Sequence, residues 1–125
     1  IIGTVKERVW KPDLSLLFAG EDNHREMLRI FVDESRKELS RLHDALHGND
    51  RQALRDILHK TLPLWETVNL DYPMETLHEI VTTDPDKWQE KQLKEIYRIE
   101  QAASKLVIHV EKMQEEAHEK NNTDN

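Results

Sequence analysis

The sequence predicts an all-α fold, an antiparallel up-down four-helix bundle with a short extra N-terminal helix. Apolar residues recur at steps of three and four residues over long stretches, which is the period of an amphipathic helix. The 125 residues include only 3 glycines and 4 prolines, and this scarcity disfavours turn-rich β folds. The long periodic stretches are joined by short turn sequences, as in up-down bundles.

The N-terminal residues predict a linker followed by a short helix. Residues 1–12 show no clear period, and Pro12 precedes Asp13, a residue suited to cap a helix. Residues 13–19 can form two helical turns that stop at Gly20, so we expect a lid helix there. The chain opens with Ile1 and has neither an initiator Met nor a signal-peptide pattern, which predicts a fragment excised from a longer parent chain.

Two long amphipathic helices are expected next. The first begins at Asp22 or Asn23 and ends at Gly48. Its periodic residues are Leu28, Phe31, Val32, Ser35, Leu39, Leu42, Ala45 and Leu46. A tight turn over residues 48–50 leads into the second helix, which returns antiparallel to the first. Its periodic residues are Ala53, Leu54, Ile57, Leu58, Thr61, Trp65 and Val68.

The second half predicts a shorter helix and then a long one. Pro73 can occupy the first position of the third helix, which ends at residues 82–85. Its apolar residues are Met74, Leu77, Ile80 and Val81. A last helix of about seven or eight turns follows. It carries Trp88, Leu93, Ile96, Tyr97, Ala103, Leu106, Val107, Val110 and Met113.

These elements predict a bundle over residues 13–118 and a disordered polar tail over residues 119–125. The expected core seam is Leu28, Phe31, Leu39, Leu42, Leu54, Ile57, Leu58, Trp65, Leu93, Ile96, Ala103, Val107 and Val110. The seam places Trp65 in the core, whereas Trp10 either folds back onto the bundle or belongs to the linker.

Charge and composition restrict the partners. The chain has 18 Lys and Arg against 25 Asp and Glu, a net charge of −7, which argues against nucleic acid and favours a protein partner. The absence of Cys excludes a disulfide scaffold, a Cys-ligated zinc site and thiol catalysis. No apolar run approaches the ~20 residues that span a bilayer. We therefore expect a cytoplasmic monomer without membrane contact by this segment, although the parent protein can be membrane-anchored.

One histidine stands out on the helical wheel. With Ile57 at zero, the apolar residues of the second helix centre near ~50° and His59 falls at ~200°. An exposed imidazole, with a pKa of about 6.5, is largely neutral at pH 7 and can accept a phosphoryl group. The same position also fits an ordinary solvated histidine. The neighbours expected to support His59 are Arg55, Lys60, Pro63 and Glu66.

The residues around His59 resemble a known family. Residues 56–70 (DILHKTLPLWETVNL), preceded by residues 31–49 (FVDESRKELSRLHDALHGN), resemble a histidine-containing phosphotransfer (HPt) domain. The resemblance covers about residues 13–118, and residues 16–22 are similar to the family's short opening helix. It implies a four-helix bundle in which His59 is the phosphoacceptor.

The motif departs from the commonest family pattern, His-x-x-Lys-Gly. Here Lys60 directly follows His59, Leu62 occupies the Lys position and Pro63 the Gly position. The pattern His-Lys-x-x-Pro-Leu is similar to the subgroup attached to hybrid two-component sensor kinases. Whether Lys60, Arg55 or neither holds the phosphate stays open. We expect the larger contribution from Lys60, because Asp56 can engage Arg55.

The resemblance implies a phosphorelay. The partner is then the receiver domain of a response regulator, which carries an aspartyl phosphate and its own Mg²⁺, and this chain needs no cofactor. The sequence has no Gly-rich phosphate loop, so the chain is not a kinase by itself, although its parent can be a hybrid histidine kinase.

Two alternatives remain at this stage. One is a non-catalytic helical bundle for protein interaction. The other is a metal-binding bundle, because His43 and His47 stand at positions i and i+4 and can form half of a site. One His pair is not enough for a di-iron site, which needs several His and carboxylate side chains from facing helices. The remaining histidines are expected to be solvated or boundary residues: His24, His78, His109 and His118.

Overall fold

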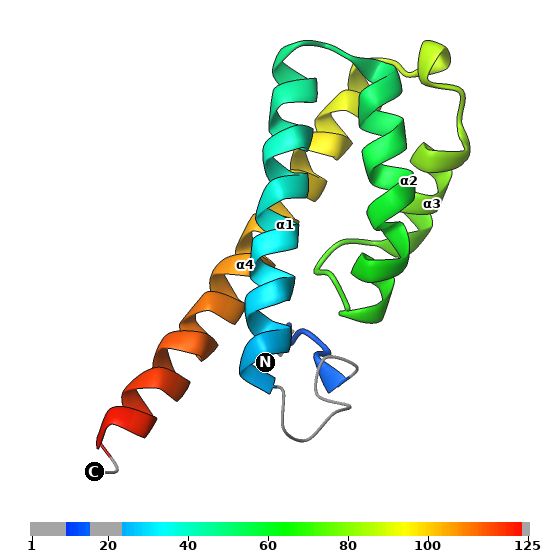
Figure 1. Cartoon of the computed structure of the whole chain (residues 1–125). Coiled ribbons are helices and arrows are strands. Elements are labelled where there is room, and N and C mark those ends of the chain that lie inside the picture. The colour runs from blue at the N-terminus through cyan, green and yellow to red at the C-terminus, as the bar shows by residue number, and fades with distance from the viewer. Residues whose placement is uncertain (1–9, 16–23, 124–125) are drawn as a thin grey trace, which may run out of the picture.

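The computed structural model describes residues 10–15 and 24–123, the last of these (117–123) by their backbone alone (Figure 1). Within these ranges the chain is helical and contains no strand, which confirms the all-α prediction there. The elements are α1 (His24–His47), α2 (Arg51–Thr67), α3 (Met74–Thr82), the short 3₁₀ helix η2 (Pro85–Lys87) and α4 (Glu90–Thr123). The expected lid helix over residues 13–19 lies largely outside the described residues.

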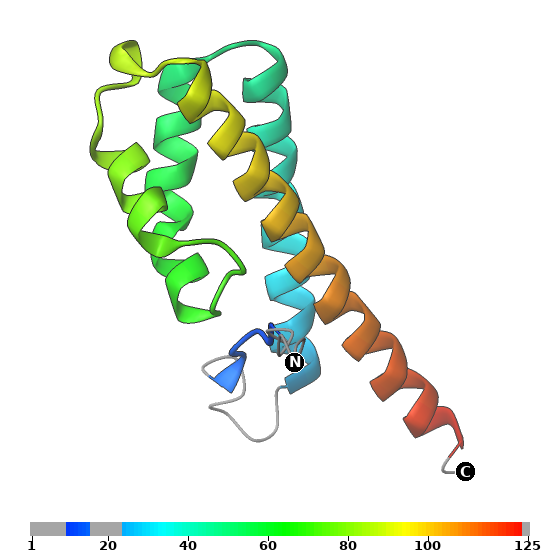
Figure 2. The same cartoon turned by 180° about the vertical axis from the view of Figure 1, so that it is seen from behind.

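Helix α1 lies between two neighbours. It packs along α4 and also against α2, and α3 lies beside α2 (Figures 1 and 2). The C-terminal part of α4 extends beyond the N-terminal end of α1 in both views. No helix in the described part of the chain is both long enough and apolar enough to cross a membrane.

The turn between α1 and α2 forms as expected. The Gly48 amide donates to the Asp44 carbonyl at 2.9 Å, and Asn49 adopts a left-handed conformation with φ of 51°. Asp50 then caps α2, because its side chain accepts a hydrogen bond from the Ala53 amide at 3.1 Å. This cap fixes where α2 begins and therefore which of its residues face the core.

The connection before α4 differs from the expectation. Trp88 does not belong to the last helix, which begins at Glu90. Residues 85–87 form a 3₁₀ turn instead, started by Asp84, whose side chain accepts from the Asp86 amide. Trp88 ends this turn with its ring buried, and its Nε1 donates to the Ile80 carbonyl at 3.2 Å. The third helix follows Pro73, which caps α3 rather than opening it.

The core agrees with the expected seam with two kinds of difference. Leu39, Ile57 and Leu93 are half-buried rather than buried. The apolar period expected for the last helix includes Tyr97, which is 55% exposed, and omits Ile99, which is fully buried. The buried row of α4 follows steps of three and four residues and leaves Tyr97 one residue to the side of it. This row is Ile96, Ile99, Ala103, Leu106 and Val110.

The described residues near each terminus are more closely associated with the helices than expected. The indole Nε1 of Trp10 donates to the Asn69 carbonyl at 2.7 Å, and the Asp13 amide donates to the Val68 carbonyl at 2.9 Å. Trp10 therefore folds back onto the helices, within the segment expected as linker. At the other end, α4 continues to Thr123, so the expected tail of residues 119–125 is helical over most of its length. Helix propagation from the packed part of α4 accounts for this continuation.

Candidate functional site

The central residue of the candidate site, His59, is exposed on the outer side of α2. Its neighbour Leu58 is fully buried. The inner face of α2 is formed by Leu54, Leu58, Thr61 and Trp65. Because successive residues lie about 100° apart on a helix, this inner face directs His59 away from the core.

Arg55 lies one turn before His59, on the same side of α2. Its side chain is 38% exposed, and its Nη1 lies 3.9 Å from Asp56 Oδ1, close to the limit for an ion pair. The same Asp56 oxygen accepts a hydrogen bond from Gln52 Nε2 at 2.9 Å. Arg55 is therefore only loosely held by its carboxylate neighbour and can turn toward a group on His59.

Pro63 lies one turn after His59 and is exposed within α2. A proline has no amide hydrogen, so it cannot donate the usual i+4 hydrogen bond to the carbonyl of His59.

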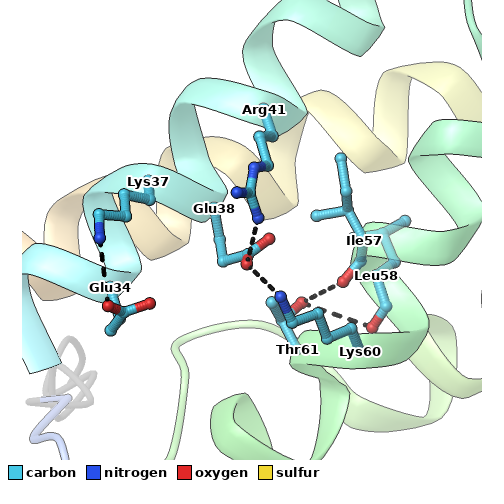
Figure 3. Close-up of polar contacts among 8 residues, drawn as sticks. All are labelled: Glu34, Lys37, Glu38, Arg41, Ile57, Leu58, Lys60 and Thr61. Atoms are coloured by element: carbon cyan, nitrogen blue, oxygen red, sulfur yellow. Dashed lines mark hydrogen bonds and ion pairs between the residues drawn. The ribbon is translucent and has the colours of Figure 1, made fainter.

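Lys60 reaches toward α1. Its Nζ donates to Glu38 Oε1 at 2.7 Å, and the same oxygen accepts from Arg41 Nη1 at 3.0 Å (Figure 3). The expectation that Lys60 is freer than Arg55 is therefore not what the structure shows, because Lys60 has the closer partner. The three residues form an ion-pair cluster that joins α1 to α2.

A small hollow of about 170 Å³ lies beside this cluster, between α1 and α2. Its lining includes Ser35 and Glu38 of α1 and Thr61 of α2. The Thr61 hydroxyl donates to the Ile57 carbonyl at 2.8 Å. In contrast, Ser35 Oγ and Glu38 Oε2 are buried without a hydrogen-bond partner. Glu38 thus uses one carboxylate oxygen for both cations.

Glu66 is two turns after His59, about 10 Å along the helix axis. Its carboxylate contacts His78 Nε2 of α3. This contact connects α2 to α3. The partner of Glu66 in the structure is therefore His78 and not His59.

The possible metal half-site forms a different surface. The rings of His43 and His47 lie with centroids 4.3 Å apart, and His43 Nδ1 lies 2.9 Å from Glu100 Oε1. They border a groove of about 550 Å³ between α1 and α4 that also includes Tyr97 and Ile108. Among the described residues no group of three or more His, Cys, Asp or Glu side chains is arranged to hold a metal ion.

His109 and His78 each contact another side chain. His109 packs edge-on against Trp10 with centroids 5.9 Å apart, and His78 contacts Glu66. The side chain of His118 lies outside the described residues.

Sequence reasoning missed Glu38. It stands in a run of charged residues and therefore resembles an ordinary surface carboxylate. A signal was nevertheless present, because Glu38 lies three residues after Ser35 and four before Leu42, both of which are buried. This spacing puts Glu38 at the edge of the buried face of α1.

The arrangement combines an exposed imidazole with a loosely held guanidinium one turn away and an ammonium engaged on the neighbouring helix. Such a site can offer a nucleophilic nitrogen to an electrophile brought by another molecule. The chain matches no protein family, no curated protein and no solved structure.

Proposed function

We propose that this chain is a histidine phosphotransfer module in which His59 accepts a phosphoryl group from an aspartate of a receiver domain and passes one back. The observation that carries the proposal is the outward exposure of His59 on α2, directly beside the buried Leu58. The helices would then form an antiparallel up-down four-helix bundle that holds α2 rigidly and leaves His59 accessible. The resemblance of residues 56–70 to HPt domains supports the same assignment.

The transfer is a nucleophilic displacement at phosphorus. The lone pair of the unprotonated ring nitrogen of His59 forms the P–N bond. The P–O bond to the donor aspartate breaks, and its electron pair stays on the aspartate carboxylate. The proton on the other ring nitrogen remains on the imidazole or passes to water. Because an acyl phosphate and a phosphoramidate are both high-energy species, the reaction runs in either direction.

The module contributes a positioned nucleophile and nearby positive charge. Phosphoryl transfer requires little covalent chemistry of the protein, so the rate depends on how the nucleophile is positioned and on the charges that surround the phosphoryl oxygens. Arg55 is the cation on the His59 side of α2, and Lys60 is the second, once it leaves Glu38. The Mg²⁺ of the reaction belongs to the receiver domain, which neutralises the phosphoryl oxygens from its own side.

The test is incubation of the chain with a phosphorylated receiver domain. We expect one phosphoryl group to appear on this chain, and phosphohistidine is recognised because it is labile in acid and stable in base. The variant His59→Gln is expected to take up none. Uptake by this variant equal to that of the wild type would overturn the proposal.

A helical interaction module without phosphoryl chemistry is the second candidate. The observation in its favour is the groove between α1 and α4, where Tyr97 and Ile108 are 55% and 50% exposed. Failure of every receiver and every small phosphoryl donor to modify His59 would favour this candidate.

A further inference from the structure

We propose that Glu38 is a positioning residue for Lys60, which it holds on α1 while His59 is unmodified and releases when His59 carries a phosphoryl group. This inference rests on the proposed function. It adds a residue from a second helix to the site and gives Lys60 two positions.

The contact itself is the first argument. Glu38 is only 12% exposed, and its Oε1 lies 2.7 Å from Lys60 Nζ. Figure 3 shows the side chain of Lys60 extending from α2 toward α1 and meeting Glu38 between the two helices. The remainder of Lys60 is well exposed, at 65% of its side chain, so its long stem is not packed in place. Lys60 is therefore held at its charged end alone.

Arg41 is the second argument, because it allows Lys60 to leave. A buried carboxylate without a counter-ion is strongly unfavourable, so an ion pair with a single partner would resist opening. Here Arg41 Nη1 lies 3.0 Å from the same Glu38 oxygen. When Lys60 departs, Glu38 keeps one cation and stays neutralised.

The third argument is the charge that phosphorylation brings. A phosphoryl group on a side chain carries nearly two negative charges at pH 7. The Glu38 carboxylate carries one, which Arg41 already shares. Lys60 therefore finds a stronger and less compensated anion on His59 than on Glu38. Adjacent residues on a helix do not face each other, so reaching that anion requires the flexible lysine stem to turn around α2.

The direction of the effect follows from the transition state. Phosphoryl transfer to water passes through a loose, metaphosphate-like state with less negative charge on the phosphoryl oxygens than phosphohistidine has. A cation on those oxygens stabilises phosphohistidine more than the transition state, and so slows its hydrolysis. Glu38 competes for this cation, and removing its charge is expected to lengthen the life of phosphohistidine.

The experiment uses phosphoramidate, a small phosphoryl donor that needs no protein partner. The wild type, Glu38→Gln, Lys60→Ala and the double variant are phosphorylated, freed of donor and followed as phosphohistidine decays. We expect Glu38→Gln to lengthen the lifetime about three- to tenfold, the scale of one ordinary hydrogen bond in its net contribution. The double variant should decay like Lys60→Ala, because Glu38 acts only through Lys60.

The matched control is Glu100→Gln. Glu100 is a similarly buried carboxylate, 15% exposed, and it also pairs with a neighbouring helix, through His43 of α1. Because this contact joins α1 to α4 rather than α1 to α2, its loss should leave the phosphohistidine lifetime unchanged. A purely structural role of Glu38 would instead change stability alone, which helical content and thermal unfolding measure for each variant.

The possible outcomes separate the two proposals. If the wild type takes up no phosphoryl group from phosphoramidate or a receiver, the proposed function fails and this inference fails with it. If the wild type is phosphorylated but Glu38→Gln decays at the same rate, only the inference is overturned. A Glu38→Gln effect that persists without Lys60 overturns it as well. If Glu38→Gln does not fold, the NMR resonance of Lys60 Nζ is measured in the wild type before and after phosphorylation of His59. An unchanged resonance would contradict the release of Lys60 from Glu38.

Discussion

Leu58 and His59 are consecutive residues of α2 with opposite environments. Leu58 is fully buried in the core, and His59 is exposed to solvent. A helix turns by about 100° per residue, so the burial of Leu58 fixes the outward direction of His59. Core and site are thus linked by one helical register. Variants of the two residues should have opposite consequences for stability and for activity.

Truncation of Leu58 to Ala should destabilise the fold. Removing most of a buried leucine side chain costs about 2 to 5 kcal/mol, because transfer energy is lost and a cavity forms. Chemical denaturation monitored by helical content measures the change. Ile30→Ala is the control, since Ile30 of α1 is 44% exposed and its truncation should cost about 0.5 kcal/mol or less. Equal losses for the two variants would contradict the register.

His59→Gln should abolish phosphoryl acceptance and leave stability nearly unchanged. An exposed substitution away from specific contacts shifts stability by about 0.5 kcal/mol or less. The measurements are phosphoryl uptake from a phosphorylated receiver and thermal unfolding of the same preparations. His47→Gln, an exposed histidine on α1, should retain full uptake. A large loss of stability in His59→Gln would assign His59 a structural role instead.

The helical periods of the sequence predicted the α2 register and the α1–α2 turn because both depend on local patterns. The three- and four-residue spacing of the apolar residues predicted that Leu58 is buried and His59 exposed. Asp50 has the type of side chain that caps the start of a helix. Other features depend on contacts between distant segments. Trp88 looked like the first apolar residue of α4, yet its indole donates to the Ile80 carbonyl and the helix starts after it.

The partners of charged side chains were the least predictable part of the site. Lys60 looked free from the sequence of α2, because its partner Glu38 lies 22 residues earlier on another helix. Trp10 was equally ambiguous, since the acceptor for its indole is the Asn69 carbonyl, 59 residues away. A backbone carbonyl has no signature in the sequence. Such pairings follow only once the helices are packed.

Arg55→Ala should impair the phosphorylated state more than Lys60→Ala. Arg55 is loosely paired at 3.9 Å, whereas Lys60 must first leave Glu38, which reduces its net contribution. A charge-assisted hydrogen bond to the phosphoryl oxygens is worth about 1 to 3 kcal/mol, so Arg55→Ala should shorten the phosphohistidine lifetime or slow transfer accordingly.

Transfer rates at low and high salt identify the cause. Added salt screens exposed charges, so both effects should shrink as ionic strength rises. Parental transfer rates in both variants would mean that the receiver supplies all the charge stabilisation.

Stability should fall at high pH through Tyr72. Burial, followed by the nearby Glu95 carboxylate, raises the pKa of Tyr72 to about 12 from the ordinary 10.0. The unfolded chain therefore loses this proton at lower pH than the folded one, and the stabilisation, fully present below pH 10, is lost as pH rises toward 12.

Tyr72→Phe should remove this part of the alkaline decline. At neutral pH the variant should be as stable as the wild type or more so, because the Tyr72 hydroxyl is buried without a hydrogen-bond partner. Urea unfolding at about pH 9 and about pH 11 compares the stability below this window with the stability within it. Tyr97→Phe is the control, since Tyr97 is 55% exposed and should leave the alkaline decline intact.

Asn69→Ala should loosen the N-terminal segment from the helices. Asn69 has a left-handed backbone with φ of 57°, and its Nδ2 donates to the Lys11 carbonyl at 2.9 Å. Alanine loses this hydrogen bond and is strained at positive φ, at a combined cost of about 1 to 3 kcal/mol. Asn69→Gly loses the hydrogen bond but tolerates the left-handed conformation, so it should cost less than Asn69→Ala.

Denaturation measures the cost of both substitutions, and the indole N–H resonance of Trp10 reports whether the N-terminal segment stays attached to the helices. An unchanged Trp10 signal in both variants would contradict this prediction. It would show that the Asn69 backbone carbonyl, which both variants keep, is enough to hold the segment without the Asn69 side chain.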